Sequence, residues 1–182
     1  MSTEKKDRYE IRLSGSGGQG LILAGVILGE AAGIHDGKNV VQTQSYGPEA
    51  RGGASRSDVI ISDYEIYYPK TMKLDLLLAL TKEAYDKYRG DLKDNGLLIV
   101  DSWDFKEAPE NAVFLPMVRE ARETLKKPMV GNIIALGVIA ELSGIVSKEA
   151  LTKTVLERVP KGTEEINCQA LELGYSLARQ FK

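Results

Sequence analysis

Apolar and polar residues alternate along the chain in a pattern that predicts an α/β domain. Strands are predicted at Tyr9–Leu13, Asn39–Ser45, Ser57–Ser62, Glu65–Tyr68, Leu74–Leu80, Leu97–Val100 and Val113–Leu115. Helices are predicted at Leu21–Ala32, Lys82–Tyr88, Val118–Lys126 and Ile133–Leu142, then after Ser147 as far as Arg158 and after Thr163 as far as Arg179. The predicted helix caps are Thr81, Asn132, Ser147 and Thr163, and Gly144 is predicted to end the helix Ile133–Leu142. Val118–Lys126 is predicted as a charged surface helix, and Asp94-Asn95-Gly96 as a turn before the strand Leu97–Val100. We expect a mostly parallel sheet that contains one antiparallel hairpin, with Ser57–Ser62 and Glu65–Tyr68 as its strands.

The first predicted helix is apolar on nearly every side, and Glu30 is its only charged residue. A helix of this kind in a soluble protein has to be covered all round. Gly25, Gly29 and Gly33 are four residues apart and form one stripe, although each glycine costs a helix about 0.5–1 kcal/mol relative to alanine. We therefore expect the stripe to let the sheet or another helix come very close, with further cover from a partner subunit as an open possibility.

A glycine-rich loop joins the first strand to this helix. Its sequence, Gly15-Ser16-Gly17-Gly18-Gln19-Gly20, matches the pattern G-x-G-x-x-G. A strand, a glycine turn and a helix N-terminus together aim free N–H groups at one place, which usually takes an anion such as phosphate. The second strand ends in Gln44-Ser45, without the acid that holds a ribose, which argues against NAD. Two interpretations stay open from these residues: phosphate or pyrophosphate binding, and tight strand–helix packing.

A second segment rich in turn formers follows the second strand, as the glycine loop follows the first. It reads Tyr46-Gly47-Pro48-Glu49-Ala50-Arg51-Gly52-Gly53. Loops that leave the carboxyl ends of neighbouring strands gather at one crevice, so we expect both loops to face one site. Arg51 offers a planar five-donor group to a phosphate or carboxylate. The alternatives for Arg51 are an interface contact and a surface pair with Glu49.

Composition narrows the chemistry further. The 182 residues are 43% apolar and 27% charged, which suits a single domain, expected at 8–182 after a disordered tail at 1–7. The net charge of −2 gives no reason to expect nucleic acid, and no apolar run is long enough for a membrane span, so the cytoplasm is the expected location. A lone cysteine, Cys168, excludes an internal disulfide and leaves no iron–sulfur cluster on this chain.

No catalytic group and no metal site is recognisable. The chain has no P-loop pattern and no His, Cys or carboxylate cluster at metal spacing. His35, the only histidine, is predicted to be a solvated turn residue, and Asp101 to cap the next turn rather than face the crevice. Tyr64, Tyr67 and Tyr68 are expected to serve edge packing or an interface, because no basic patch accompanies them. A phosphate-suited loop without a catalytic group favours a binding or accessory subunit.

An ordered series of motifs resembles one known family. The series comprises the Gly15–Gly20 loop, Tyr46–Gly53, Ile61-Ser62-Asp63, Asn132 with Leu136-Gly137, and Asn167 with Gly174. It is similar to the gamma subunit of 2-oxoacid:ferredoxin oxidoreductases over roughly Tyr9 to Tyr175. Tyr46 and Gly53 favour the 2-oxoglutarate branch. Lys126-Lys127-Pro128 depart from the family pattern just before Asn132.

This resemblance implies a three-layer α/β gamma domain within an enzyme complex. Such a complex decarboxylates 2-oxoglutarate on thiamine diphosphate, reduces ferredoxin through iron–sulfur clusters and forms succinyl-CoA. Thiamine diphosphate, Mg and the clusters are expected on other chains, namely the alpha and beta subunits and a ferredoxin-like subunit or ferredoxin. For this chain the resemblance implies coenzyme A binding. The expected contacts are Gly15, Ser16, Gly17, Gly18, Gln19, Gly20, Tyr46, Glu49, Arg51, Gly52, Gly53 and Asn132.

Two alternatives remain from the sequence. One is a stand-alone nucleotide-binding or sensor module, expected to be a monomer that binds nucleotide by itself. The other is a gamma subunit that serves a pyruvate, branched-chain or indolepyruvate enzyme. A subunit of any such complex is expected to expose apolar surface when isolated, and therefore to aggregate or to form a homodimer.

Overall fold

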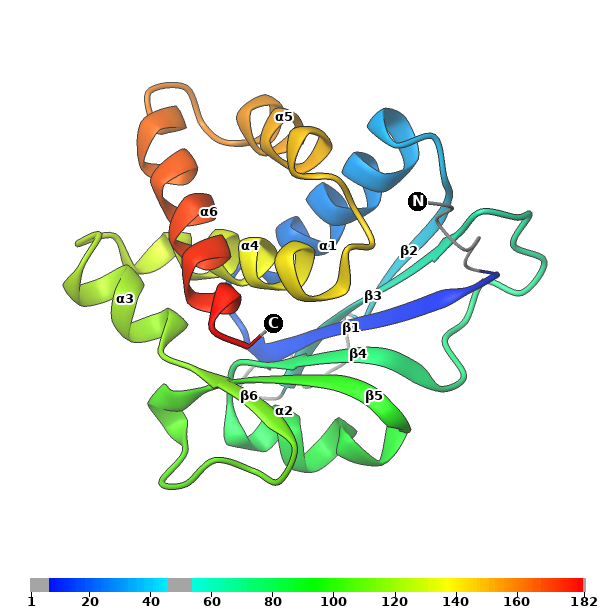
Figure 1. Cartoon of the computed structure of the whole chain (residues 1–182), viewed down its shortest axis with the longest axis horizontal. Helices are drawn as coiled ribbons and strands as arrows, with labels where there is room; N and C mark the ends of the chain where they lie inside the picture. Colours follow the sequence, from blue (N-terminus) through cyan, green and yellow to red (C-terminus); the bar gives the residue numbers. More distant parts are fainter. Residues whose placement is uncertain (1–6, 46–53, 182) are drawn as a thin grey trace.

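The computed structural model of the chain describes residues 7–45 and 54–181 (Figure 1). Its strands are β1 (Tyr9–Ser16), β2 (Asn39–Ser45), β3 (Ala54–Ser62), β4 (Leu74–Ala79), β5 (Leu92–Asp101) and β6 (Ala112–Leu115). Its α-helices are α1 (Leu21–Glu30), α2 (Lys82–Tyr88), α3 (Met117–Glu123), α4 (Gly131–Ser143), α5 (Lys148–Arg158) and α6 (Glu164–Arg179). Shorter helical turns are η1 (Ala31–His35), η3 (Arg89–Asp91), η4 (Ser102–Asp104) and η5 (Pro128–Val130).

Within the described residues the strands form one sheet in the order β2-β3-β1-β4-β5-β6. β1, β4, β5 and β6 pair in parallel, whereas β3 runs antiparallel to both β1 and β2. The prediction of a mostly parallel sheet with an antiparallel pair is therefore confirmed. The three-layer arrangement is confirmed as well, because α1, α4, α5 and α6 lie on one side of the sheet and α2 on the other (Figure 1).

The predicted place of the hairpin is wrong. Glu65–Tyr68 forms no strand, and the antiparallel partners of β3 are β1 and β2 instead. The physical reason is that both edges of β3 are occupied, by β1 along Tyr9–Ser16 and by β2 along Asn39–Ser45. The guanidinium of Arg8 instead donates to the carbonyls of Tyr68 and Lys70, at 2.8 and 2.6 Å, and so ties that loop to the start of β1.

β5 is also longer than the pattern predicted. The strand begins at Leu92, and the segment Asp94-Asn95-Gly96, predicted as a turn, lies inside it. Leu74 pairs with Leu92 but Leu76 pairs with Leu97, so the extra residues form an irregularity in the β4–β5 register. A bulge accepts turn-forming residues without ending the strand, which is why the turn signal misplaced the boundary.

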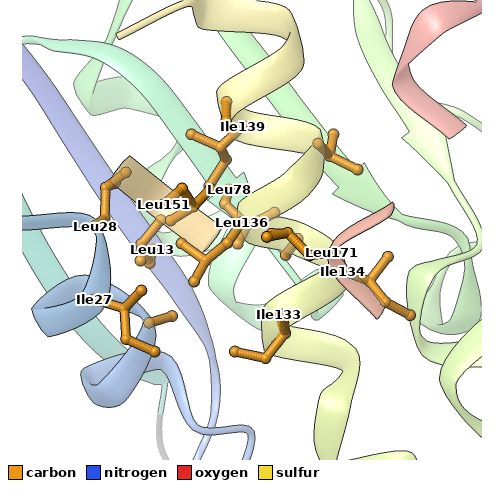
Figure 2. Packing of buried hydrophobic residues seen from close by; sticks show 14 of the residues in the cluster. Leu13, Ile27, Leu28, Leu78, Ile133, Ile134, Leu136, Ile139, Leu151 and Leu171 are labelled. Carbon is orange, nitrogen blue, oxygen red and sulfur yellow. The ribbon is translucent and has the colours of Figure 1, made fainter. Parts of the chain in front are cut away.

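The main core lies between the sheet and the helices on its larger face. Leu13 of β1 and Leu78 of β4 pack against Ile27 of α1 and Leu136 of α4, with α5 and α6 covering that layer (Figure 2). A smaller core on the opposite face joins Leu77 of β4 to α2. Beside this smaller core, a buried ion pair crosses the sheet. The Arg12 guanidinium of β1 donates to both Asp58 carboxylate oxygens of β3, at 2.7 and 2.9 Å.

The glycine stripe of α1 was predicted to let either the sheet or another helix come close, and in the structure it faces the sheet. A Cβ added at Gly25 would lie 2.1 Å from Oγ of Ser57, and Cβ atoms added at Gly29 and Gly33 would lie 3.3 and 3.4 Å from the side chain of Val40. The absence of these Cβ atoms therefore sets how closely α1 approaches β2 and β3.

The helix also continues further than predicted. It passes into the π-turn η1 and reaches His35, where the sequence predicted a turn from Gly33. His35 is not a solvated turn residue: its side chain is only 15% exposed, and Nε2 lies 3.3 Å from Oε2 of Glu157. α5 packs against this turn, and that contact supplies the cover that the local sequence did not indicate.

Helix caps follow the predictions in most places. Thr81 and Ser147 each accept a hydrogen bond from the amide three residues ahead, so they cap α2 and α5, and Gly144 ends α4 with φ +59°. Thr163 does not cap α6 with its side chain, and that prediction is wrong. Its hydroxyl donates to the carbonyl of Pro160 at 2.7 Å and is therefore used in the preceding turn.

Asp101 ends β5 and is fully buried. Its carboxylate accepts from the amide of Trp103 at 2.8 Å and from the amide of Val118 at 2.7 Å. The prediction that it caps the next turn is confirmed, and it also anchors the first turn of α3. Burial raises the pKa of the Asp101 carboxyl, although these amide hydrogen bonds act in the opposite direction.

The two longest inner helices cross backbone to backbone. A Cβ at Gly174 of α6 would lie 2.1 Å from the carbonyl oxygen of Ile134, and one at Gly137 of α4 would lie 2.4 Å from that of Leu171. Because the opposing atoms belong to the backbone, no side-chain rotation relieves either contact. The crossing therefore depends on glycine at both positions.

Gly174→Ala is expected to lower the free energy of unfolding by about 1–3 kcal/mol, because the helices have to separate to admit the methyl group. That cost exceeds the gain in helix propensity of about 0.5–1 kcal/mol. Urea-induced unfolding measures the change. Gly90→Ala is the matched control, because a Cβ at Gly90 meets no atom within 4 Å. Equal stabilities for the two variants would contradict the close crossing.

Asp101→Asn is expected to lower the free energy of unfolding by about 1–3 kcal/mol, because one of the two amides loses its acceptor. The effect should depend on pH. The folded pKa of Asp101 lies above its unfolded value of about 3.9, so the contribution of this group is greatest below that value and is lost as pH rises through the folded pKa. The stability of the wild type relative to the variant, measured by urea unfolding, should thus decline as pH rises. A difference that grows with pH would refute this account.

Candidate functional site

The glycine loop is a closed turn between β1 and α1. The Gln19 side chain folds back, so that its Oε1 accepts from the amide of Ser16 at 2.8 Å. Gly18 and Gly20 have φ values of +87° and +71°, a left-handed conformation that glycine adopts without strain. Gly20 is the N-cap of α1 and has no side chain to cap the first turn, so the amides of that turn have no side-chain acceptor there.

The glycines of the loop differ in what surrounds them. Gly15 serves packing, because a Cβ there would lie 2.2 Å from Oε1 of Gln19 and 3.1 Å from Cβ of Leu80. Gly17 and Gly18 instead meet no atom within 4 Å and line an open space. The outer half of the loop therefore leaves its backbone approachable, while the inner half fits the loop to the sheet.

Asn132 has a different role from the predicted one. It does not cap α4, which begins at Gly131 with Val130 at the N-cap. The Asn132 side chain is buried and its Nδ2 donates to the carbonyl oxygen of Gly20 at 3.1 Å. A Cβ at Gly20 would lie 2.5 Å from that nitrogen, so glycine at this position makes room for the contact. Asn132 thereby joins the start of α4 to the glycine loop.

A cleft of about 350 Å³ opens between the glycine loop and the segment from α3 to the start of α4. This volume falls within the range of about 300–1,000 Å³ that is common for small-molecule sites. The lining residues are Ser16, Gly17, Gly18, Gln19, Leu80, Val118, Arg122, Pro128, Met129, Gly131 and Asn132. The structure thus brings four of the predicted loop residues, Ser16 to Gln19, together with Asn132 at one cleft, whereas Gly15 and Gly20 do not line it.

Sequence reasoning missed the α3 wall of this cleft. The helix was predicted as a charged surface segment, yet Val118 and Arg122 both line the cleft and the guanidinium of Arg122 lies 4.9 Å above the ring of Trp103. Val118 and Arg122 are four residues apart and share one helix face. That spacing was the available signal, but only the fold turns this face toward the glycine loop.

The other predicted site residues, Tyr46, Glu49, Arg51, Gly52 and Gly53, lie outside the described residues. The flanks of their segment are described. Ser45 at the end of β2 pairs with Arg56, and Ala54 at the start of β3 pairs with Ser16 at the mouth of the glycine loop. Both flanks therefore lie at the same end of the sheet as the loop, as the predicted common crevice requires.

The described residues contain no group of three or more His, Cys, Asp or Glu side chains arranged to hold a metal ion. Among them, none of the helices has both the length and the apolar character that a membrane crossing demands.

Comparison with known proteins assigns the family. The pyruvate ferredoxin/flavodoxin oxidoreductase family model matches residues 10–177. The chain is 53% identical to the 2-oxoglutarate synthase subunit KorC of Methanocaldococcus jannaschii over 181 residues, which cover 97% of each protein. It is 32% identical to the pyruvate synthase subunit PorC of Methanothermobacter thermautotrophicus, over 91% of this chain and 93% of the relative.

Solved structures agree. The gamma subunit of the keto/oxoacid ferredoxin oxidoreductase from Geobacter sulfurreducens superimposes with a TM-score of 0.84 at 51% identity, over 94% of this chain and 99% of that subunit. The 2-oxoglutarate:ferredoxin oxidoreductase of Magnetococcus marinus, solved with 2-oxoglutarate, coenzyme A and succinyl-CoA bound, gives a TM-score of 0.85 at 26% identity, over 98% of this chain and 32% of that one. The chain therefore belongs to the pyruvate ferredoxin/flavodoxin oxidoreductase family, as a gamma-type subunit of its 2-oxoglutarate branch.

Proposed function

We propose that this subunit binds coenzyme A in the cleft beside the glycine loop, within a complex that oxidatively decarboxylates 2-oxoglutarate and reduces ferredoxin. The observation that carries the proposal is the open backbone at Gly17 and Gly18, next to the uncapped first turn of α1. Backbone amides at a helix N-terminus suit phosphate groups, and coenzyme A carries several. The Magnetococcus marinus enzyme, whose matched region has the same fold, was solved with coenzyme A bound.

The residues of this chain would bind and orient the ligand rather than react with it. Coenzyme A, when bound, supplies the thiol that accepts the acyl group. The glycine loop would hold a phosphate group through its amides, and Asn132 would keep the loop in place through the carbonyl of Gly20. Arg51 and the neighbouring Tyr46, Glu49, Gly52 and Gly53 remain proposed contacts from the second loop. No residue of this chain is proposed as catalytic.

The chemistry of the complex is proposed to reside on partner chains. Thiamine diphosphate, Mg and iron–sulfur clusters would belong to the alpha and beta subunits and to a ferredoxin-like subunit or ferredoxin. The single Cys168 agrees with this division, since a cluster requires several thiolates. The matched region makes up only 32% of the Magnetococcus marinus chain, so the same domain there continues into other parts of one polypeptide. We propose that the complex works in the cytoplasm.

Large apolar side chains on the surface support such partners. Leu23 of α1 is 39% exposed and Ile34 of η1 is 70% exposed, and Tyr67 and Met72 project from the loop between β3 and β4. The expected apolar helix is thus only partly covered within this chain. These positions are the proposed places for contact with other subunits.

Gly17→Val is expected to raise the KM for coenzyme A by about tenfold or more in the reconstituted complex, because the side chain enters the cleft where the ligand approaches the backbone. The melting temperature should not change, since a Cβ at Gly17 meets no atom within 4 Å. Steady-state kinetics measure the KM values for coenzyme A and 2-oxoglutarate.

The KM for 2-oxoglutarate should stay at the wild-type value, because that substrate is assigned to other subunits. Gly90→Val, at an open position of η3 that does not line the cleft, is the control for bulk alone. An unchanged KM for coenzyme A in Gly17→Val would remove the cleft as its binding site.

Coexpression tests the proposed partners. The chain is expected to co-purify with thiamine-binding and ferredoxin-like subunits, and to self-associate when produced alone, because the apolar positions on α1 and η1 then lose their cover. Size-exclusion chromatography with mass spectrometry gives both results. A stable monomer without partners that binds a nucleotide by itself would favour the sensor interpretation instead.

A further inference from the structure

Arg122 is the one charged side chain among the described residues that line the cleft. It projects from α3, on the wall opposite the glycine loop. The backbone amides of the loop carry partial positive charge, and Arg122 adds a full positive charge. The walls of the cleft thus present positive charge from two sides, although the chain as a whole has a net charge of −2.

The Arg122 guanidinium is held by a ring rather than by a carboxylate. It lies 4.9 Å from the centre of the Trp103 ring, and no ion pair among the described residues engages it. Stacking occupies one face of the guanidinium and leaves the N–H groups on its edge available. This arrangement suits an arginine that has to be held in place while its hydrogen-bond donors remain free.

Asp101 links the ring and the helix that together position Arg122. Its carboxylate accepts from the amide of Trp103 at 2.8 Å and from the amide of Val118 at 2.7 Å. Trp103 lies in η4, directly after the end of β5, and Val118 lies one helical turn before Arg122 in α3. A single buried group therefore fixes both parts of the α3 wall relative to the sheet from which the glycine loop also leaves.

We propose that Arg122 is a phosphate-binding residue of this cleft, and that Trp103 is the residue that positions it. The proposal rests on the proposed function, in which the cleft takes coenzyme A. One phosphate group would lie between the loop amides and the edge of the guanidinium, which makes charge-assisted hydrogen bonds that are stronger than neutral ones. The cleft would thus recognise the phosphorylated part of its ligand.

The test measures binding of desulfo-coenzyme A, which lacks the reactive thiol, to the reconstituted complex by isothermal titration calorimetry. Arg122→Gln is expected to raise the Kd by about 10- to 100-fold, the loss that corresponds to one charge-assisted contact. It should also flatten the dependence of the Kd on salt concentration, because one charge no longer meets the phosphate. Arg122→Lys should recover part of the affinity, since the charge remains but the planar donor group does not.

Arg119→Gln is the matched control, because it removes the same charge from the same helix at an exposed position that does not line the cleft. It should keep both the affinity and the salt dependence of the wild type. Trp103→Ala should weaken binding less than Arg122→Gln does, and the double variant should bind no more weakly than Arg122→Gln alone, because the ring acts through the arginine.

The outcomes separate this inference from the proposed function. If Gly17→Val weakens binding and Arg122→Gln does not, the cleft holds the ligand but Arg122 does not contact it. If neither variant changes the Kd, the proposed function fails and the inference fails with it. If Arg119→Gln and Arg122→Gln have equal effects, general surface charge explains the loss and the specific contact is refuted. Additive effects of Trp103→Ala and Arg122→Gln would refute the positioning role.

Discussion

Close contacts that only glycine permits set the separation of the layers in this domain. α1 rests on β3 where Gly25 faces Ser57, and α4 crosses α6 where Gly137 meets Gly174. At each place a single methyl group would collide with a neighbouring residue, and at the α4–α6 crossing the neighbour is backbone that cannot rotate away. Protein interiors have little free volume, so such contacts fix the separation of the layers to within a fraction of an ångström. The cleft lies beside these contacts, because its walls come from the glycine loop that precedes α1, from α3 and from the start of α4.

The same residue type serves two purposes within the glycine loop. Gly15 makes room for the side chains of Gln19 and Leu80. Gly20 makes room for the side chain of Asn132. Gly17 gives space to whatever occupies the cleft. A loop that is fitted closely on its inner side and open on its outer side is already ordered before a ligand arrives. A preformed loop loses little conformational entropy when a ligand binds, which would favour affinity for the proposed ligand.

The cleft and the exposed apolar surface of this domain are both consistent with a subunit of a larger complex. Among the described residues, its cleft presents the Arg122 guanidinium and the backbone of the glycine loop, and no group of side chains is arranged to hold a metal ion. The exposed apolar residues of α1 and η1 are costly for an isolated protein and reasonable for one that is covered by partners. In the Magnetococcus marinus enzyme the matched domain makes up 32% of a longer chain.

The sequence by itself determined most of the local structure. Periodicity located the strands and helices, Thr81 and Ser147 marked helix starts, Gly144 marked a helix end, and the motif series indicated the family. These features succeed because they depend on φ and ψ preferences and on side-chain directions within a few residues. Local pattern also located the glycine loop, but it left open which of its glycines served packing.

Only the tertiary structure decided which distant residues meet. β3 pairs on both edges, which excluded the predicted hairpin with Glu65–Tyr68, and no local signal reports whether an edge is free. Asn132 resembles a helix cap in sequence, yet its amide group bonds to Gly20, 112 residues away. Arg122 resembles an ordinary surface charge until α3 is placed opposite the glycine loop. Such contacts follow from the order of strands in the sheet and the crossing of helices, and these depend on the energy of the whole chain rather than on any one segment of it.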